Sequence, residues 1–497
     1  MTRKSVFLAC TSALLMGVPQ ASAADTLQEA LRTAYVRNPT LTAQRAAVRA
    51  ASEEVPQARV EGRPTLDGDV TYQENVLQGE PAGGGLLSDP DRQVSAQLSA
   101  KVPLFNFGAV TQNVRAAEQR VEASRLGLRS TESELFTNVV GAYMDVLKDE
   151  AVVQLNLRNS EVMRFTVRET GERRQAGNRG PTDVAQAEAR MALAESQLET
   201  ASAQLISSRE NYVRLVGSPP GTLSQPPVLP NMPTNVDMAV AAALEKNPRL
   251  LAARKQQTAA GYDVKVATAR RYPRLNGIGG LNQYGYLGSL ADNTGPRNRA
   301  NEGTTAYVGV RLEMPILDGG RGISQQREAR ALEQQRYFEV LAAERAVVAE
   351  VRSAYATWLA AGRVVKTAQR GVDANSRVLS GLRAETVAGF RPLLDRLNAE
   401  QELLNAEVTL VTAGRDAYVA GFALLAAMGM AEARDLNFDQ GVLYDPTLTY
   451  KELQRRTVGG DAGQSLIEGT STADSPAQDA VVAPTTVPAV PQIPPEN

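Results

Sequence analysis

Two short turns in the sequence carry charged residues where long helical stretches end and restart. The turns share one order of glycine, proline and aspartate: Gly177, Pro181 and Asp183 in the first, and Gly389, Pro392 and Asp395 in the second. In each turn the glycine ends a helix, the proline restarts it, and the carboxylate follows in the first helical turn. Such a carboxylate either attracts a cation or only complements the positive end of the helix dipole. The residues alone leave both interpretations open.

The composition excludes most enzyme chemistry. The chain has 497 residues, no histidine and one cysteine, Cys10, and its 53 Lys and Arg nearly balance 55 Asp and Glu. Because the chain has no histidine, it has no imidazole base. Once the segment that holds Cys10 is removed, the chain also lacks a thiol nucleophile, a Cys/His zinc site and a disulfide framework. With 5% aromatic residues and no basic stripe, the chain also lacks the features of nucleic-acid-binding proteins. We expect no cofactor, no metal and no nucleic-acid partner.

Residues 1–23 have the pattern of a secretory signal peptide. Arg3 and Lys4 precede an apolar run, and small residues at 21–23 form a cleavage site. An alternative is a lipoprotein signal in which Cys10 would carry the lipid, although too few residues precede it for a charged region and an apolar run. After the signal, no run approaches the ~18 apolar residues of a membrane-spanning helix. If the mature chain crosses a bilayer, the sequence predicts that it does so as a β-barrel.

The chain repeats itself at a nearly constant offset. Asn38-Pro39 recurs as Asn247-Pro248, 209 positions later, and Gly177 recurs as Gly389, 212 positions later. We interpret residues 24–235 and 236–445 as two copies of one structural unit. The remaining residues, 446–497, have no Lys or Arg after Arg456 and are rich in proline near the end, so we expect a disordered periplasmic tail.

Each copy has the same predicted order of elements. A helical stretch comes first (26–60 and 237–271), and two alternating segments with a turn-rich loop between them follow. These predicted strands are 65–76 and 94–104 in the first copy, and 275–287 and 305–316 in the second. Their lengths suit the ~9 to 11 residues of outer-membrane strands, and a soluble hairpin capping a helical bundle is the alternative. Four prolines are placed at the predicted helix–strand junctions: Pro64, Pro103, Pro273 and Pro315.

Long proline-free helical stretches follow each predicted hairpin, at 107–175 and 319–387. Each would measure ~100 Å at ~1.5 Å per residue, which exceeds any compact domain. The returning stretches, 182–216 and 391–429, carry apolar residues at strict seven-residue spacing, so we assign those residues to a coiled-coil core.

Four strands cannot close a barrel in a bilayer, because an open sheet edge in lipid would leave backbone groups unpaired. Other copies of the chain must complete the sheet. Two copies would give eight strands with a filled lumen, whereas three give twelve strands and a wider lumen. The fold class is therefore predicted as α+β: a trimeric barrel in outer-membrane lipid, continued by a long helical tunnel in the periplasm.

At this point the sequence resembles the TolC-like outer-membrane channel proteins of efflux and type I secretion systems. The resemblance spans about residues 25 to 445 and is carried by the two Asn-Pro pairs, both Gly-to-Asp turns, and two further motifs: Val102-Pro103-Leu104-Phe105 and Pro315-Ile316-Leu317-Asp318-Gly319-Gly320. It implies a homotrimer with a 12-stranded barrel on an α-helical tunnel. It also implies two partners, a periplasmic adaptor (membrane fusion) protein and an inner-membrane transporter of the RND or ABC type.

The resemblance also implies roles for residues at the periplasmic tip, where this family closes its tunnel. Asp395 matches the first of two aspartates that line the entrance, and the second corresponds to neutral Asn398. Any cation-binding ring should therefore be weaker here. Thr182, Asp183 and Arg391 match polar contacts that hold the entrance shut. Thr386 stands where a tyrosine is expected opposite Asp183, which puts that half of the lock in doubt.

We expect a non-enzymatic exit duct for small molecules or secreted proteins, located in the outer membrane with a periplasmic extension. One alternative is an enzyme that works through paired carboxylates, but no cleft-forming domain lies between the helices. Another is a structural coiled-coil spacer or surface adhesin without a conducting lumen. The sequence does not separate drug efflux from protein secretion.

Overall fold

A computed structural model describes residues 25–76, 90–177, 180–288, 300–388, 390–436, 444–445 and 476–481. The predicted signal peptide with Cys10, Gly389 and most of the predicted tail lie outside these residues. The first repeat contains α1 (Leu27–Arg37), α2 (Pro39–Ser52), α3 (Glu54–Val60), β1 (Thr65–Glu74), β2 (Arg92–Phe105), α4 (Ala109–Gln175) and α5 (Pro181–Val216). The second contains α6 (Val236–Lys246), α7 (Pro248–Ala269), β3 (Arg274–Gly285), β4 (Glu302–Glu313), α8 (Arg321–Val387) and α9 (Leu393–Ala427).

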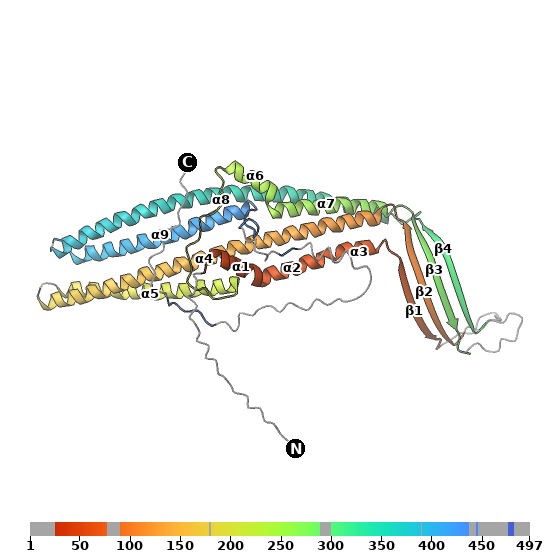
Figure 1. Cartoon of the computed structure of the whole chain (residues 1–497), viewed down its shortest axis with the longest axis horizontal. Coiled ribbons are helices and arrows are strands. Elements are labelled where there is room, and N and C mark those ends of the chain that lie inside the picture. The colour runs from red at the N-terminus through yellow and green to blue at the C-terminus, as the bar shows by residue number, and fades with distance from the viewer. Residues whose placement is uncertain are drawn as a thin grey trace, which may run out of the picture.

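The described chain is a long rod of helices with a four-stranded sheet at one end (Figure 1). The turns that join α4 to α5 and α8 to α9 lie at the opposite end. At 67 residues each, α4 and α8 are ~100 Å long, as the sequence predicts. Sheet and turns are thus held about a helix length apart.

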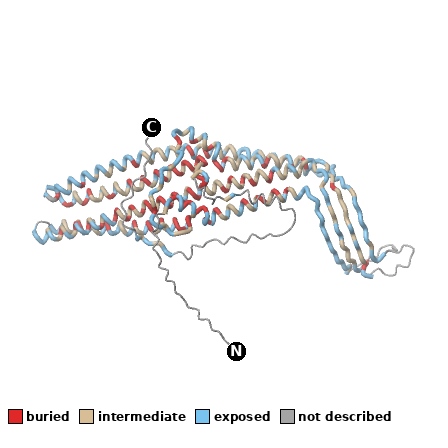
Figure 2. Tube along the Cα trace, in the orientation of Figure 1, coloured by how far each residue is buried: buried red, intermediate tan, exposed pale blue. Residues whose placement is uncertain are grey.

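Alpha4 is the central helix of the rod. It packs against α5 toward the turns and against α7 toward the sheet, and it also contacts α9 and the N-terminal helices α1 to α3. Buried residues concentrate midway along the rod, where Phe136 and Tyr143 of α4 are fully buried, whereas the sheet and the turn end are mostly exposed (Figure 2). The largest hydrophobic core therefore lies where α1, α4, α5 and α9 meet.

Each Asn-Pro pair separates two helices, α1 from α2 in the first repeat and α6 from α7 in the second. Asn38 caps α2 by accepting a hydrogen bond from the Thr40 amide (2.9 Å). Its side-chain amide donates to the carbonyl of Leu215 near the end of α5 (2.9 Å). The proline that follows takes the first helical position, where its missing N–H costs nothing. The break thus ties the α1–α2 junction to the end of α5.

The sheet is antiparallel with the order β1-β2-β3-β4, and its two faces differ in polarity. One face carries mainly apolar side chains and glycines, for example Val70, Leu98 and Val308, which are all exposed in the single chain. The other face carries polar and charged ones, among them Asp69 and Lys101. Such alternation is the pattern of strands between lipid and a polar lumen.

The predicted junction prolines occupy two kinds of place. Pro64 and Pro273 directly precede β1 and β3, and Pro315 lies between β4 and α8. Pro103 lies inside β2, where the register against β3 shifts between Pro103 and Phe105. A proline has no N–H to donate, and a bulge is where a strand tolerates that loss. The prediction that Pro103 marks a helix–strand junction is therefore corrected to a strand irregularity.

Alpha8 is preceded by the sequence Asp318-Gly319-Gly320, which the first repeat lacks. The carboxylate of Asp318 accepts hydrogen bonds from the amides of Gly320 (2.9 Å) and Gly322 (2.7 Å). Gly320 has a φ of 85°, a left-handed conformation in which a side chain would be strained. These amide contacts lower the pKa of Asp318, so the charged carboxylate caps the helix.

One helix within the described part of the chain, α9, is long and apolar enough to cross a membrane by length and composition alone. The sequence of α9 still has no unbroken apolar run of ~18 residues, because Arg415 and Asp416 interrupt it. More than half of its most apolar stretch is buried against other helices of the rod, so packing accounts for its apolar character.

Candidate functional site

The turn end of the rod brings together most of the residues that the sequence singles out. Gly177 has a φ of 77° just after α4, and its amide donates to the carbonyl of Arg174 (2.9 Å), as expected of a glycine that ends a helix. In the second turn, the Phe390 amide donates to the carbonyl of Glu385 (2.9 Å), and the Phe390 side chain is 82% exposed. The described residues at the ends of the two helical hairpins, α4–α5 and α8–α9, are mostly exposed.

Arg391 lies between two carboxylates of its own hairpin. Its Nε donates to Glu385 Oε2 (2.9 Å), and its Nη1 lies 3.7 Å from Asp395 Oδ2. All three side chains are more than a third exposed, so these pairs are weak. Within one chain, Arg391 thus partly offsets the charge of Asp395. Thr182 and Asp183 lie in the first turn of α5, on the other helical hairpin.

Thr386 and Asn398 stand where the family resemblance implies a tyrosine and an aspartate, and their surroundings differ. Thr386 is buried, and within the described residues its hydroxyl oxygen has no hydrogen-bond partner. Asn398 faces α5, where its Oδ1 accepts a hydrogen bond from Arg190 Nη2 (2.7 Å). Asn398 therefore links the two helical hairpins of one chain. The sequence shows only that Asn398 lacks the charge of an aspartate, so it does not reveal this role.

Sequence reasoning also missed the residue next to Asp395. Arg396 reaches α4, where its Nη2 donates to Thr166 Oγ1 (3.1 Å) and lies 3.4 Å from Glu169 Oε2. An apolar cluster lies beside these contacts, formed by Met163, Ala194, Leu393 and Leu397. The heptads identify Leu397 as a core residue, but no pattern in the sequence pairs residues of two separate hairpins.

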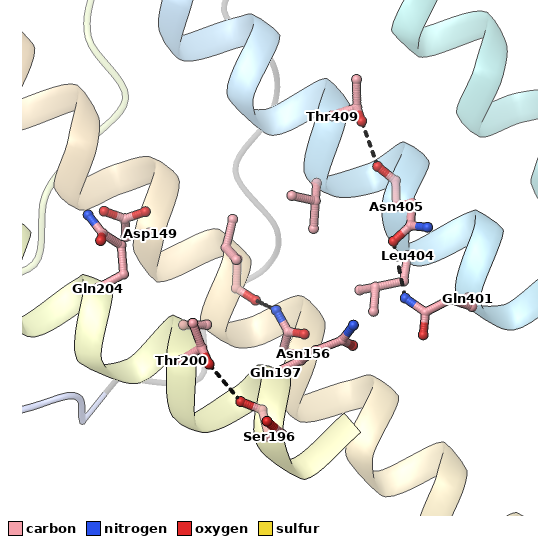
Figure 3. A pocket seen from close by; sticks show the side chains of 13 residues that line it. Asp149, Asn156, Ser196, Gln197, Thr200, Gln204, Gln401, Leu404, Asn405 and Thr409 are labelled. Carbon is pink, nitrogen blue, oxygen red and sulfur yellow. Dashed lines mark hydrogen bonds between the residues drawn. The ribbon is translucent and has the colours of Figure 1, made fainter. Parts of the chain in front are cut away.

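A groove lies further along the same boundary (Figure 3). It has a volume of about 600 Å³, and α4, α5 and α9 line it mainly with polar side chains, among them Asn156, Gln197, Thr200, Gln401 and Asn405. The hydrogen bonds drawn there stay within single helices, such as Thr200 to Ser196 and Gln401 to Asn405. The groove therefore presents polar groups from two hairpins that no drawn bond joins across it.

The described residues contain no group of three or more His, Cys, Asp or Glu side chains placed to hold a metal ion. A single Asp395 with a nearby arginine also makes a poor cation site. A ring of Asp395 carboxylates, as the family resemblance implies, would require further copies of the chain.

Comparisons with known proteins agree with this geometry. A model of the family "Outer membrane efflux protein" matches residues 30–218 and 239–430, which covers both repeats. The outer membrane efflux protein BepC of Brucella suis is 31% identical over 92% of this chain and 98% of its own length. The alkaline protease secretion protein AprF of Pseudomonas aeruginosa is 28% identical over 70% of this chain and 72% of its own length.

The fold comparison gives the same result. The Campylobacter jejuni CmeC outer membrane channel superposes with a TM-score of 0.71 over 91% of this chain and 98% of that one, at 17% identity. That identity supports the fold and nothing finer.

Proposed function

Because the chain belongs to the outer membrane efflux protein family, we propose that three copies form the exit duct of a tripartite export system. The protein is an outer-membrane channel with the α+β fold of this family. Three sheets of four strands make a 12-stranded barrel, and the helices continue it as a tunnel across the periplasm. The observation that carries the proposal is the two-faced sheet at one end of ~100 Å helices.

The partners follow from how this family works, with an adaptor and an inner-membrane transporter. For this chain we assign a periplasmic adaptor (membrane fusion) protein and a transporter of the RND or ABC type. The polar groove lined by α4, α5 and α9 is the adaptor contact in this proposal, because its Gln, Asn and Thr side chains are hydrogen-bonded only within their own helices and can offer further hydrogen bonds to an incoming helix. Relatives named for efflux and for protease secretion support a duct for small molecules or proteins, with the cargo chosen elsewhere.

At the entrance, Asp395 from three copies forms the constriction, flanked by Asn398, and the tip contacts involve Thr182, Asp183, Thr386 and Arg391. A ring of three carboxylates closer than a Debye length of ~8 Å holds a negative potential that admits cations. Arg391 weakens that potential through its 3.7 Å contact with Asp395, so cation preference is moderate.

The test of assembly is the mass of the mature protein extracted from outer membranes in detergent. Three chains plus detergent are expected, because a single four-stranded sheet leaves the free edges of β1 and β4 unpaired. A stable monomer that conducts ions in a bilayer would refute the proposal.

A further inference from the structure

The boundary between the two hairpins of one chain, here called the seam, is built from matched contacts along α4 and α9. At the end nearer the sheet, Arg415 of α9 forms two hydrogen bonds to the carboxylate of Asp145 of α4 (2.9 and 3.2 Å). Near the turns, Arg396 of α9 meets Glu169 and Thr166 of α4. The two arginines are ~28 Å apart along the helix.

Between these ends the seam is weaker. Glu407 of α9 lies between them along the chain, and burial raises its pKa although the positive charge of Arg158 on α4 lowers it. The polar groove occupies part of this stretch, with Leu404 and Asn405 of α9 in its lining. The α8–α9 hairpin is therefore fastened to α4 by charged contacts at two places.

The contact near the turns is well enclosed. The side chain of Arg396 is 12% exposed and that of Glu169 is 23% exposed, and Thr166 is buried. Glu169 also receives Arg173 from the next turn of α4 (2.7 Å), so its carboxylate is held from two sides. Charge-assisted hydrogen bonds with this little exposure are stronger than surface ion pairs.

We propose that Arg396 is a positioning residue that fastens the entrance end of the α8–α9 hairpin to α4 and thereby fixes where its neighbour Asp395 stands. When Arg396 releases Glu169 and Thr166, α4 loses its charged contact with the α8–α9 hairpin at the turn end. The Arg190–Asn398 hydrogen bond and the apolar cluster then hold that end alone, so the separated arrangement becomes more populated, while Asp145 and Arg415 still hold the hairpin nearer the sheet. The consequence for flux rests on the proposed export function, whereas the position of the hairpin does not.

The position of the hairpin can be measured directly by spin labelling. The one cysteine of the chain, Cys10, precedes the mature protein if the signal is removed, so labels at Glu161→Cys and Ser380→Cys need no other change. Both positions are exposed, one on α4 and one on α8. In spin-diluted trimers, double electron–electron resonance reports the distance between the hairpins of one chain.

Arg396→Gln is expected to shift the distance distribution toward longer values and to raise the ratio of separated to closed hairpins about tenfold, which corresponds to ~1.4 kcal/mol. Arg396→Lys, which keeps the charge, should restore most of the closed population. Glu169→Gln should act like Arg396→Gln, and the double variant should shift no further than either single one, because both remove one contact. The matched control is Arg164→Gln, since Arg164 meets Glu195 of its own hairpin at the same level.

An unchanged distance distribution in Arg396→Gln, matching Arg164→Gln, would overturn the proposal. Fully additive effects of the Arg396 and Glu169 changes would also overturn it, because they would indicate two separate packing losses. If the proposed export function is wrong, cells show no transport that depends on this protein, while the distances between the hairpins still change as predicted for each variant. Trimer mass in detergent confirms that each variant is folded.

Discussion

Asn38 and Asn247 form equivalent hydrogen bonds 209 positions apart in the chain. Asn38 donates from its side chain to the carbonyl of Leu215 at the end of α5, and Asn247 donates to the carbonyl of Ala427 at the end of α9 (2.9 Å each). Both asparagines also cap the helix that follows them. Each repeat thus uses one buried amide to join its returning helix to a helix break.

Removing either amide should destabilise the trimer. Asn247→Ala leaves the buried carbonyl of Ala427 without this donor and α7 without its cap, a loss of ~2 to 4 kcal/mol. Asn235→Ala is the control, because Asn235 only caps α6 at an exposed site and should cost ~1 kcal/mol. Denaturant unfolding measures the difference, and equal losses in both variants would contradict the role of the tertiary bond.

Stability should fall as pH rises from about 4.5 to about 7 because of Glu132 on α4. Burial raises the pKa of Glu132 to about 7, partly offset by a hydrogen bond from the Ala433 amide (2.7 Å). A carboxyl with a raised folded-state pKa stabilises the fold fully below its unfolded value near 4.5 and loses that contribution as pH rises through about 7. Thermal unfolding of Glu132→Gln between pH 5 and 8 should therefore vary less than that of the unchanged protein. The same slope in both proteins would count against this assignment.

The tail should be dispensable for assembly. Six of its residues, 476–481, lie against α5, where Arg209 donates to the backbone carbonyl of Asp479 (2.6 Å) and contacts its carboxylate. The side chain of Asp479 is 72% exposed, and an ion pair of that kind contributes ~1 kcal/mol or less. Truncation after Arg456 should leave trimer mass and conductance unchanged. Loss of the trimer on truncation would show that the segment on α5 is structural.

Charge at the entrance should depend on Asp395. Asp395→Asn removes three carboxylates per trimer at nearly constant side-chain size, so cation preference should fall and block by divalent cations from the periplasmic side should weaken. Reversal potentials in a salt gradient measure the preference. If selectivity and block stay unchanged, Asp395 only complements the start of α9.

Much of the fold could be predicted because its patterns are local. Alternation of apolar and polar residues places all four strands within about three residues of their observed bounds, and heptads identify α5 and α9. Pro103 shows the limit of this reasoning. A proline predicts the end of a strand, but β2 continues to Phe105 because it stays paired with β3. A bulge is a property of two strands together, and one strand's sequence does not contain it.

The candidate site was predictable in place but not in its contacts. The Gly-Pro-Asp order locates the turns, yet Arg396 and Glu169 are 227 positions apart, and Arg190 and Asn398 are 208 apart. Which charged side chains meet depends on how two coiled coils are rotated against each other. The composition of segment 476–481 predicts a disordered tail, because it gives no sign of the partly exposed Arg209 on α5 that the segment contacts.

The most direct test of the account is single-channel recording from the purified mature protein in a planar bilayer, with its mass determined in the same detergent. The account predicts that a species of three chains inserts and gives discrete, cation-preferring conductance steps, and that Arg396→Gln raises the conductance while Arg164→Gln does not. A structural spacer or adhesin would form trimers without conductance. A three-chain species that inserts and never conducts, in the unchanged protein and in Arg396→Gln alike, would contradict the claim that this protein is an exit duct.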